Sequence, residues 1–199
     1  MIVEDIHMQE LKERIVKEGK VLPGNIIKVD GFLNHRIDTG LLTRIAEEFG
    51  KYFNMDEVTM VLTAEASGIA LATAVATYFH KPMIFAKKAK SDNIEGGLYQ
   101  SDIYSYTYKK KVTLLVSKEW LSSDDKVLII DDFMANGEAM RGLCDIVTAA
   151  GATLMGIGCA VEKGFQGGGD KLRAAGVNLH SLAIIESAEP GNIVFREEA

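Results

Sequence analysis

The sequence has little of what a secreted, membrane-bound or disulfide-stabilised protein needs. Its 199 residues include two cysteines and three prolines. The most apolar stretch, residues 58–79, is interrupted by Glu65, Ser67 and Gly68, so no run is long and apolar enough to cross a bilayer. No secretory leader is recognisable. We therefore expect a cytoplasmic protein that does not bind a membrane.

Positive charge is also scarce. The chain carries 22 Lys and Arg residues against 28 Asp and Glu residues, which gives a net charge of −6. This balance argues against a general nucleic-acid surface, although it allows a local basic pocket. Cys144 and Cys159 lie among apolar residues, and we expect buried, reduced thiols rather than a disulfide or a metal pair. With 47% hydrophobic residues, the composition predicts a single globular domain over residues 1–199.

Hydrophobic periodicity predicts an α/β fold. From Val58 onward strands alternate with helices, which is typical of a mainly parallel, twisted sheet flanked by helices. The polar, glycine-containing residues 91–100 have no apolar period, and residues 164–169 are expected to form a glycine-rich loop. The expected helices cover about 4–18, 39–53, 68–80, 140–150 and 170–175, and the expected strands 58–63, 82–86, 104–108, 112–116, 127–130, 153–161, 177–185 and 193–195.

The stretch from Val127 to Met140 combines the strongest signals. Four branched apolar residues predict a strand that is buried on both faces, and the carboxylates of Asp131 and Asp132 follow directly. Small residues then lead into a helical pattern. Such a turn offers backbone N–H groups and a positive dipole end to an anion. Carboxylates beside a phosphate cradle suit a phosphorylated sugar, whereas the plain alternative is a strand-to-helix turn with a helix cap.

This stretch resembles the phosphoribosyl-pyrophosphate (PRPP) motif of the type I phosphoribosyltransferase family. The resemblance implies the type I phosphoribosyltransferase fold, catalytic roles for Asp131 and Asp132, and a PRPP-binding loop. That loop departs from the common threonine-containing form, but it is similar to the variant found in the bacterial xanthine branch of the family. Its residues are Ala135, Asn136, Gly137, Glu138 and Ala139.

A second loop repeats the strand, small loop and helix order. The resemblance implies that Glu65, Ala66, Ser67 and Gly68 bind pyrophosphate, together with Lys88. Taken alone, the lysines at 87, 88 and 90 would be interpreted as a solvated loop. Their place after a short strand favours a cationic partner for a diphosphate, because the chain is otherwise acidic.

Two further segments resemble the base-binding parts of the xanthine branch. The resemblance implies that Lys163 donates to an oxopurine oxygen and that Phe165 covers the ring. It also implies that Ile27 packs beside the base and that Asn34 reads its polar edge, within a hood formed by residues 20–38 and part of the C-terminus. Without this context, Lys163 would be an ordinary surface charge.

Residues 88–103 correspond to the mobile loop of the family, which would exclude water from a transition state of oxocarbenium character. Residues 167–169 are three glycines where the family has a proline, a glycine and a charged residue, and we expect local mobility there. Tyr104 is equally compatible with a role in the loop and with an ordinary strand position.

The resemblance covers nearly the whole chain and implies a purine-salvage enzyme. It would convert xanthine and PRPP to xanthosine 5′-monophosphate (XMP) and pyrophosphate, with Mg²⁺ bound through PRPP rather than by protein ligands, as a homodimer. One alternative is a hypoxanthine/guanine enzyme of the same fold. The other is a non-catalytic PRPP-sensing regulator, which the absence of a DNA-binding pattern and the negative charge oppose.

Overall fold

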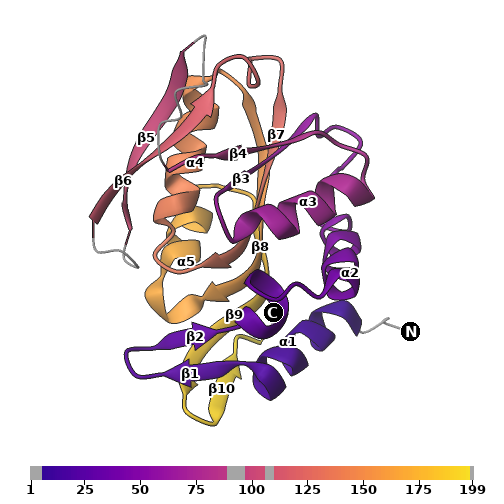
Figure 1. The fold of residues 1–199 in the computed structure, drawn as a ribbon, viewed down its shortest axis with the longest axis vertical. Coiled ribbons are helices and arrows are strands. Elements are labelled where there is room, and N and C mark those ends of the chain that lie inside the picture. Colours follow the sequence, from indigo (N-terminus) through magenta and orange to yellow (C-terminus); the bar gives the residue numbers. More distant parts are fainter. Residues whose placement is uncertain (1–5, 89–96, 106–109, 198–199) are drawn as a thin grey trace.

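A six-stranded sheet lies at the centre of the computed structural model, which describes residues 6–88, 97–105 and 110–197 (Figure 1). From one edge to the other its strands are β10 (Asn192–Phe195), β9 (Leu179–Glu189), β8 (Thr153–Lys163), β7 (Lys126–Met134), β3 (Met60–Ala64) and β4 (Met83–Ala86). The β10–β9 pair is antiparallel, and the other neighbours are parallel. The predicted mainly parallel sheet is therefore confirmed.

Helices cover both faces of this sheet (Figure 1). One face carries α1 (Ile6–Glu18), α2 (Thr39–Phe49) and α3 (Gly68–Tyr78), and the other carries α4 (Glu138–Ala149) and α5 (Gly168–Ala174). The hairpin of β5 (Leu98–Ser105) and β6 (Lys110–Ser117) packs on α4. The contact is close, because a Cβ on Gly142 of α4 would lie 2.5 Å from a methyl carbon of Ile103.

The central strand β7 explains why two hydrophobic clusters form. Its residues from Val127 to Ile130 are all 0% exposed. Val127 and Ile129 pack with α4, whereas Leu128 and Ile130 pack with α2 and α3, as the alternation of side chains along a strand requires. Each such side chain contributes about 1.5–3 kcal/mol when fully buried. The expected strand with two buried faces is confirmed.

Glycines in β8 allow a helix to approach the sheet closely. A Cβ on Gly158 would lie 2.7 Å from Ile130 and 2.9 Å from Phe49, and one on Gly156 would lie 2.6 Å from Phe53. Phe49 at the end of α2, and Phe53 just after it, therefore pack on the backbone of β8.

Several expected boundaries are wrong. The acidic pair lies inside β7, which continues to Met134, because Asp131 and Phe133 still pair with β8. The strand expected at 104–108 begins at Leu98, so residues 98–100 are not irregular. Part of the expected mobile loop, residues 89–96, lies outside the described residues, as do residues 106–109.

One loop prediction is wrong, and the expected hood contains regular structure. Residues 164–169 are not a loop, because a 3₁₀ turn spans Gly164–Gln166 and α5 begins at Gly168. The N-terminal part of the expected hood contains a hairpin of β1 (Lys20–Leu22) and β2 (Ile26–Lys28), followed by a π-helical turn over Asp30–Asn34. The turn between β1 and β2 has positive φ at Gly24 and Asn25.

Both cysteines are free thiols, Cys159 buried and Cys144 half-buried, as expected. None of the helices in the described ranges is long and apolar enough to cross a membrane.

Candidate active site

A cavity of about 200 Å³ opens at the carboxyl ends of the parallel strands. This edge is where open α/β sheets bind ligands. The cavity brings together residues at or just after the ends of β3, β4 and β7, along with residues of β5. They are Ala64, Glu65, Ser67, Lys88, Ile103, Tyr104, Asp131, Phe133, Met134, Ala135, Asn136, Gly137, Glu138, Ala139 and Met140.

Residues 135–139, which we call the phosphate loop, connect β7 to the start of α4. Gly137 has a φ of 78°, which a residue with a side chain adopts only with strain, and α4 begins directly after it. The loop therefore aims the free N–H groups of the helix start at the cavity, where they suit an anion. All five predicted loop residues line the cavity.

The carboxylate of Glu138 has partners outside the loop. It lies 3.2 Å from Arg141 Nη2 and accepts a long hydrogen bond, 3.4 Å, from the backbone N of Tyr104. Arg141 also donates to Asp145 and to the carbonyl oxygen of Asp102 in β5. The negative charge that this loop carries is thus paired with an arginine and tied to the hairpin.

Asp131 and Asp132 are both buried, at 6% and 1% exposure. As neighbours on one strand they point to opposite faces of the sheet. Asp131 lines the cavity, and its Oδ1 accepts a 3.1 Å hydrogen bond from the backbone N of Asp132. Burial, followed by the charge of Asp132, raises the pKa of Asp131 well above its ordinary value.

The predicted pyrophosphate loop reaches the same cavity through Glu65, Ser67 and Lys88. Glu65 Oε1 accepts a 2.6 Å hydrogen bond from the backbone N of Lys88, so the two segments are joined. Ala66, which is linked to Glu65 by a cis peptide bond, and Gly68 do not line the cavity. Gly68 instead lies against Asp131, because a Cβ there would overlap Asp131 Oδ1.

Asn34 is placed beside the acidic pair. Its side-chain N–H group donates a 2.7 Å hydrogen bond to Asp132 Oδ2, across 98 positions of sequence. The hood residue that was predicted to read the base therefore contacts one of the carboxylates predicted to hold the ribose. Ile27, 8% exposed, is packed into the hydrophobic core.

Lys163, at the end of β8, lies over the ring of Phe133, with Nζ 5.4 Å from the ring centre. Nζ also donates a 2.9 Å hydrogen bond to the carbonyl oxygen of Asn25 in the β1–β2 turn. Partial burial lowers the pKa of Lys163. Phe165 is partly buried against the core cluster of α1 to α3.

Sequence reasoning missed some residues around the cavity. Phe133 directly follows the acidic pair, so the motif itself could have identified it. Ile103 lines the cavity from the hairpin, and Asn25 anchors Lys163 through its backbone. Neither of these two contacts leaves a signal in local sequence.

The geometry defines a site for a ligand with anionic groups at two ends. The start of α4, the Glu65 loop with Lys88, and Asp131 all line this cavity. The family described as "Phosphoribosyl transferase domain" matches residues 35–173. The chain belongs to the phosphoribosyltransferase family.

Curated relatives specify the similarity further. The chain is 52% identical over 191 residues to the xanthine phosphoribosyltransferase of Lachnoclostridium phytofermentans, covering 95% of this chain and 98% of that protein. It is also 52% identical to the protein of the same name from Bifidobacterium longum, covering 95% of this chain and all of that protein.

Solved structures share the fold at low identity. A Giardia lamblia adenine phosphoribosyltransferase complexed with 9-deazaadenine matches with a TM-score of 0.74 and 21% identity, over 88% of this chain and 96% of that one. The Saccharomyces cerevisiae adenine phosphoribosyltransferase matches with a TM-score of 0.74 and 18% identity, over 89% of this chain and 98% of that one.

Proposed function

We propose that the protein is a pentosyltransferase of purine salvage that transfers the 5-phosphoribosyl group of PRPP to xanthine, giving XMP and pyrophosphate. The observation that carries the proposal is the identity of about one half, along nearly the whole chain, to several proteins named xanthine phosphoribosyltransferase. The cavity with two loops suited to anions supports it, because PRPP carries phosphate at both ends.

The sugar phosphate fits the part of the cavity beside β7. The backbone N–H groups of the phosphate loop (Ala135, Asn136, Gly137, Glu138 and Ala139) would hold the 5-phosphate. Asp131 and Asp132 would accept hydrogen bonds from the ribose hydroxyls and orient the ring for attack by the base nitrogen. The carboxylate of Asp132 would also stabilise the positive charge that develops on the sugar.

The leaving pyrophosphate would bind at the second loop (Glu65, Ala66, Ser67 and Gly68), with Lys88 as its cation. Glu65, Ser67 and Lys88 line the cavity, whereas Ala66 and Gly68 would act through the backbone shape of the loop. Within the described part of the chain, no group of three or more His, Cys, Asp or Glu side chains could hold a metal ion by itself. Mg²⁺ would bind through the oxygens of PRPP, as the family resemblance implies, and would neutralise charge on the leaving group.

The base would lie between the hood and the end of β8. Lys163 would donate to the exocyclic oxygen of a 6-oxopurine, whereas the amino group of adenine offers no acceptor there. The pKa of Lys163 is lowered by burial. Its ammonium group has three N–H donors, and one of them is used in the hydrogen bond to the Asn25 carbonyl oxygen. Asn34 would donate to the second carbonyl of xanthine, with Ile27 and Phe165 as apolar neighbours.

The proposal includes a homodimer and a cytoplasmic location. Both come from the resemblance to the family. Sedimentation of the purified protein tests the first of them.

A purine panel tests the reaction itself. The protein is incubated with PRPP, Mg²⁺ and xanthine, guanine, hypoxanthine or adenine in turn, and the nucleotide products are separated. We expect XMP, with kcat/KM highest for xanthine. Asp132→Asn serves as the matched inactive control. Preference for guanine or hypoxanthine would move the protein to the alternative branch, and PRPP binding without any product would favour a sensor.

A further inference from the structure

The first turn of α5 packs directly on the phosphate loop. Gly168 is buried, and a Cβ there would overlap Ala135 O and lie 2.6 Å from the backbone N of Gly137. Only a glycine allows the two backbones to approach this closely. The neighbouring glycine is equally confined, because a Cβ on Gly169 would lie 2.6 Å from Glu162 Oε2 and overlap Oε1. The mobility expected for these glycines is therefore at odds with their packing.

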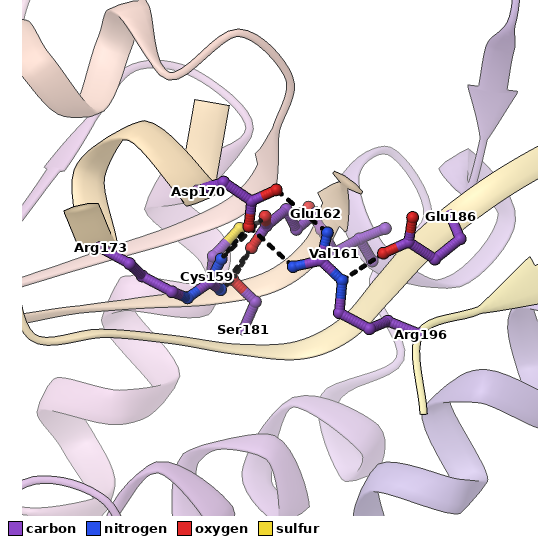
Figure 2. A network of polar contacts seen from close by, with 8 residues as sticks. All are labelled: Cys159, Val161, Glu162, Asp170, Arg173, Ser181, Glu186 and Arg196. Atoms are coloured by element: carbon purple, nitrogen blue, oxygen red, sulfur yellow. Dashed lines mark hydrogen bonds and ion pairs between the residues drawn. The ribbon is translucent and has the colours of Figure 1, made fainter. Parts of the chain in front are cut away.

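Glu162 anchors this turn from the end of β8. Its carboxylate is 0% exposed and accepts hydrogen bonds from Arg173 Nη1 at 3.1 Å and Nη2 at 2.7 Å, and from Ser181 Oγ at 2.5 Å (Figure 2). A buried carboxylate that is bridged by both guanidinium nitrogens has one strongly favoured geometry. Since Arg173 lies in α5, the pair fixes the helix against the sheet.

The same network extends to the C-terminal segment (Figure 2). Asp170 of α5 accepts hydrogen bonds from Arg196 at 2.7 and 3.1 Å, and Arg196 also pairs with Glu186. A Cβ on Gly164 would lie 3.3 Å from Arg196 Nη2, so the arginine lies beside the residue that follows Lys163. One chain of ion pairs thus links the C-terminal segment and the end of β8 to α5, the helix that packs on the phosphate loop.

The phosphate loop needs such support. Its residues are mostly small, and it offers a phosphate backbone N–H groups, whose strength depends on their being held in place before the ligand arrives. A loop shift of about 1 Å can cost on the order of 100-fold in rate.

We propose that the first turn of α5, locked by the Glu162–Arg173 pair, positions the phosphate loop for the 5-phosphate of PRPP. Gly168, Glu162 and Arg173 are then positioning residues that act through the loop without touching the substrate. The inference rests on the proposed function, because it assigns the loop its ligand. It also explains why glycines stand at positions 168 and 169.

Gly168→Ala tests the contact with two ligands that each carry one end of PRPP. Ribose 5-phosphate probes the phosphate loop, and pyrophosphate with Mg²⁺ probes the other loop, both by titration calorimetry. We expect the Kd for ribose 5-phosphate to rise at least about 10-fold, which corresponds to the loss of one hydrogen bond to a charged group. The Kd for pyrophosphate should stay within about twofold of the wild-type value. In turnover, KM for PRPP should rise more than KM for xanthine.

Gly176→Ala is the matched control. Gly176 follows the other end of α5 and has a φ of +82°, and a Cβ there would point into open space, with nothing within 4 Å. Its replacement therefore strains the backbone without touching the loop. A control that weakens ribose 5-phosphate binding as much as Gly168→Ala does would overturn the inference. An equal rise in the Kd values for ribose 5-phosphate and pyrophosphate in Gly168→Ala would also overturn it.

Arg173→Lys provides a second test if Gly168→Ala does not fold. Lysine keeps the charge but cannot bridge both oxygens of Glu162. We expect selective weakening of ribose 5-phosphate, smaller than in Gly168→Ala, and unchanged binding would overturn the proposal. Wild-type protein that binds neither ligand and makes no XMP would instead refute the proposed function. If the wild type makes XMP but the variants weaken ribose 5-phosphate and pyrophosphate binding equally, only the positioning role is refuted.

Discussion

Replacing Asp131 by asparagine is expected to stabilise the fold while it removes most of the activity. Asp131 is 6% exposed, and Asp132 beside it is 1% exposed. Two adjacent buried carboxylates repel each other and lose hydration, and both effects disfavour the ionised form. Asparagine keeps the oxygen that accepts from the backbone N of Asp132 and removes the charge.

The size of both effects follows from this environment. Replacing the destabilising carboxylate of Asp131 by an amide should raise the free energy of unfolding by about 1–2 kcal/mol at neutral pH. In a chain of this length, that raises the melting temperature by about 2–8 °C. Asparagine accepts a ribose hydroxyl less strongly than a carboxylate does, and the loss of a charged hydrogen bond lowers kcat/KM by about 10- to 150-fold.

The stability difference should depend on pH. Because the pKa of Asp131 is raised in the folded state, the folded protein binds more protons than the unfolded chain once the pH exceeds the unfolded pKa of about 3.9. The unfolding free energy of the wild type should therefore fall as the pH rises through the window between the unfolded and folded pKa values. Above the folded pKa the penalty is complete. Asp131→Asn lacks this contribution, so its advantage grows with pH across that window.

Thermal unfolding followed by circular dichroism, from about pH 4.5 to about pH 8, measures this advantage, with XMP formation assayed in parallel. Asp124→Asn is the control, because Asp124 is exposed. The reasoning is refuted if Asp131→Asn melts below the wild type at neutral pH, or if the difference between the two is the same at both ends of the range.

Three further outcomes are expected. Lys163→Met should raise KM for xanthine by about 10- to 150-fold and leave the Kd for PRPP nearly unchanged, as titration can verify; equal losses would contradict a role at the base. Asn34→Ala removes the donor to Asp132 and should lower kcat by about 10-fold, whereas unchanged turnover would leave that hydrogen bond without a role. Burial raises the pKa of Cys144 to about 11 and raises that of Cys159 well above its ordinary value, so a thiol reagent should label both slowly at neutral pH and rapidly in denaturant. Rapid labelling of the native protein would contradict this.

The parts of the fold that follow from local pattern could be predicted from the sequence. The run from Val127 to Ile130 has four branched apolar residues in succession, and only a strand buried on both faces accommodates them. Since parallel strands share a carboxyl edge, the acidic pair and the residues 65–68 were expected at one site, and Asp131, Glu65 and Ser67 do line one cavity.

Contacts between distant segments could not be predicted in the same way. Asn34 meets Asp132 across 98 positions, and Lys163 meets the Asn25 carbonyl across 138. Local periodicity contains no information about such pairs, which depend on how the hairpin of β1 and β2 folds back over the sheet. The glycines at 168 and 169 illustrate the same limit, because a glycine needed for close packing and one needed for a flexible loop look identical in sequence.

The phosphate loop carries a carboxylate, Glu138, whose charge is balanced by residues outside the loop. Backbone N–H groups at a helix start do not depend on the side chains of the loop, so a carboxylate can occupy position 138 if its charge is balanced elsewhere. Arg141, one turn along α4, provides that balance, and it also bonds the carbonyl oxygen of Asp102 in the hairpin. Glu138 in turn accepts from the backbone N of Tyr104. A hydroxyl at position 138 could not pair with an arginine in this way, so the substitution converts a loop side chain into a tie between α4 and the hairpin that lines the cavity.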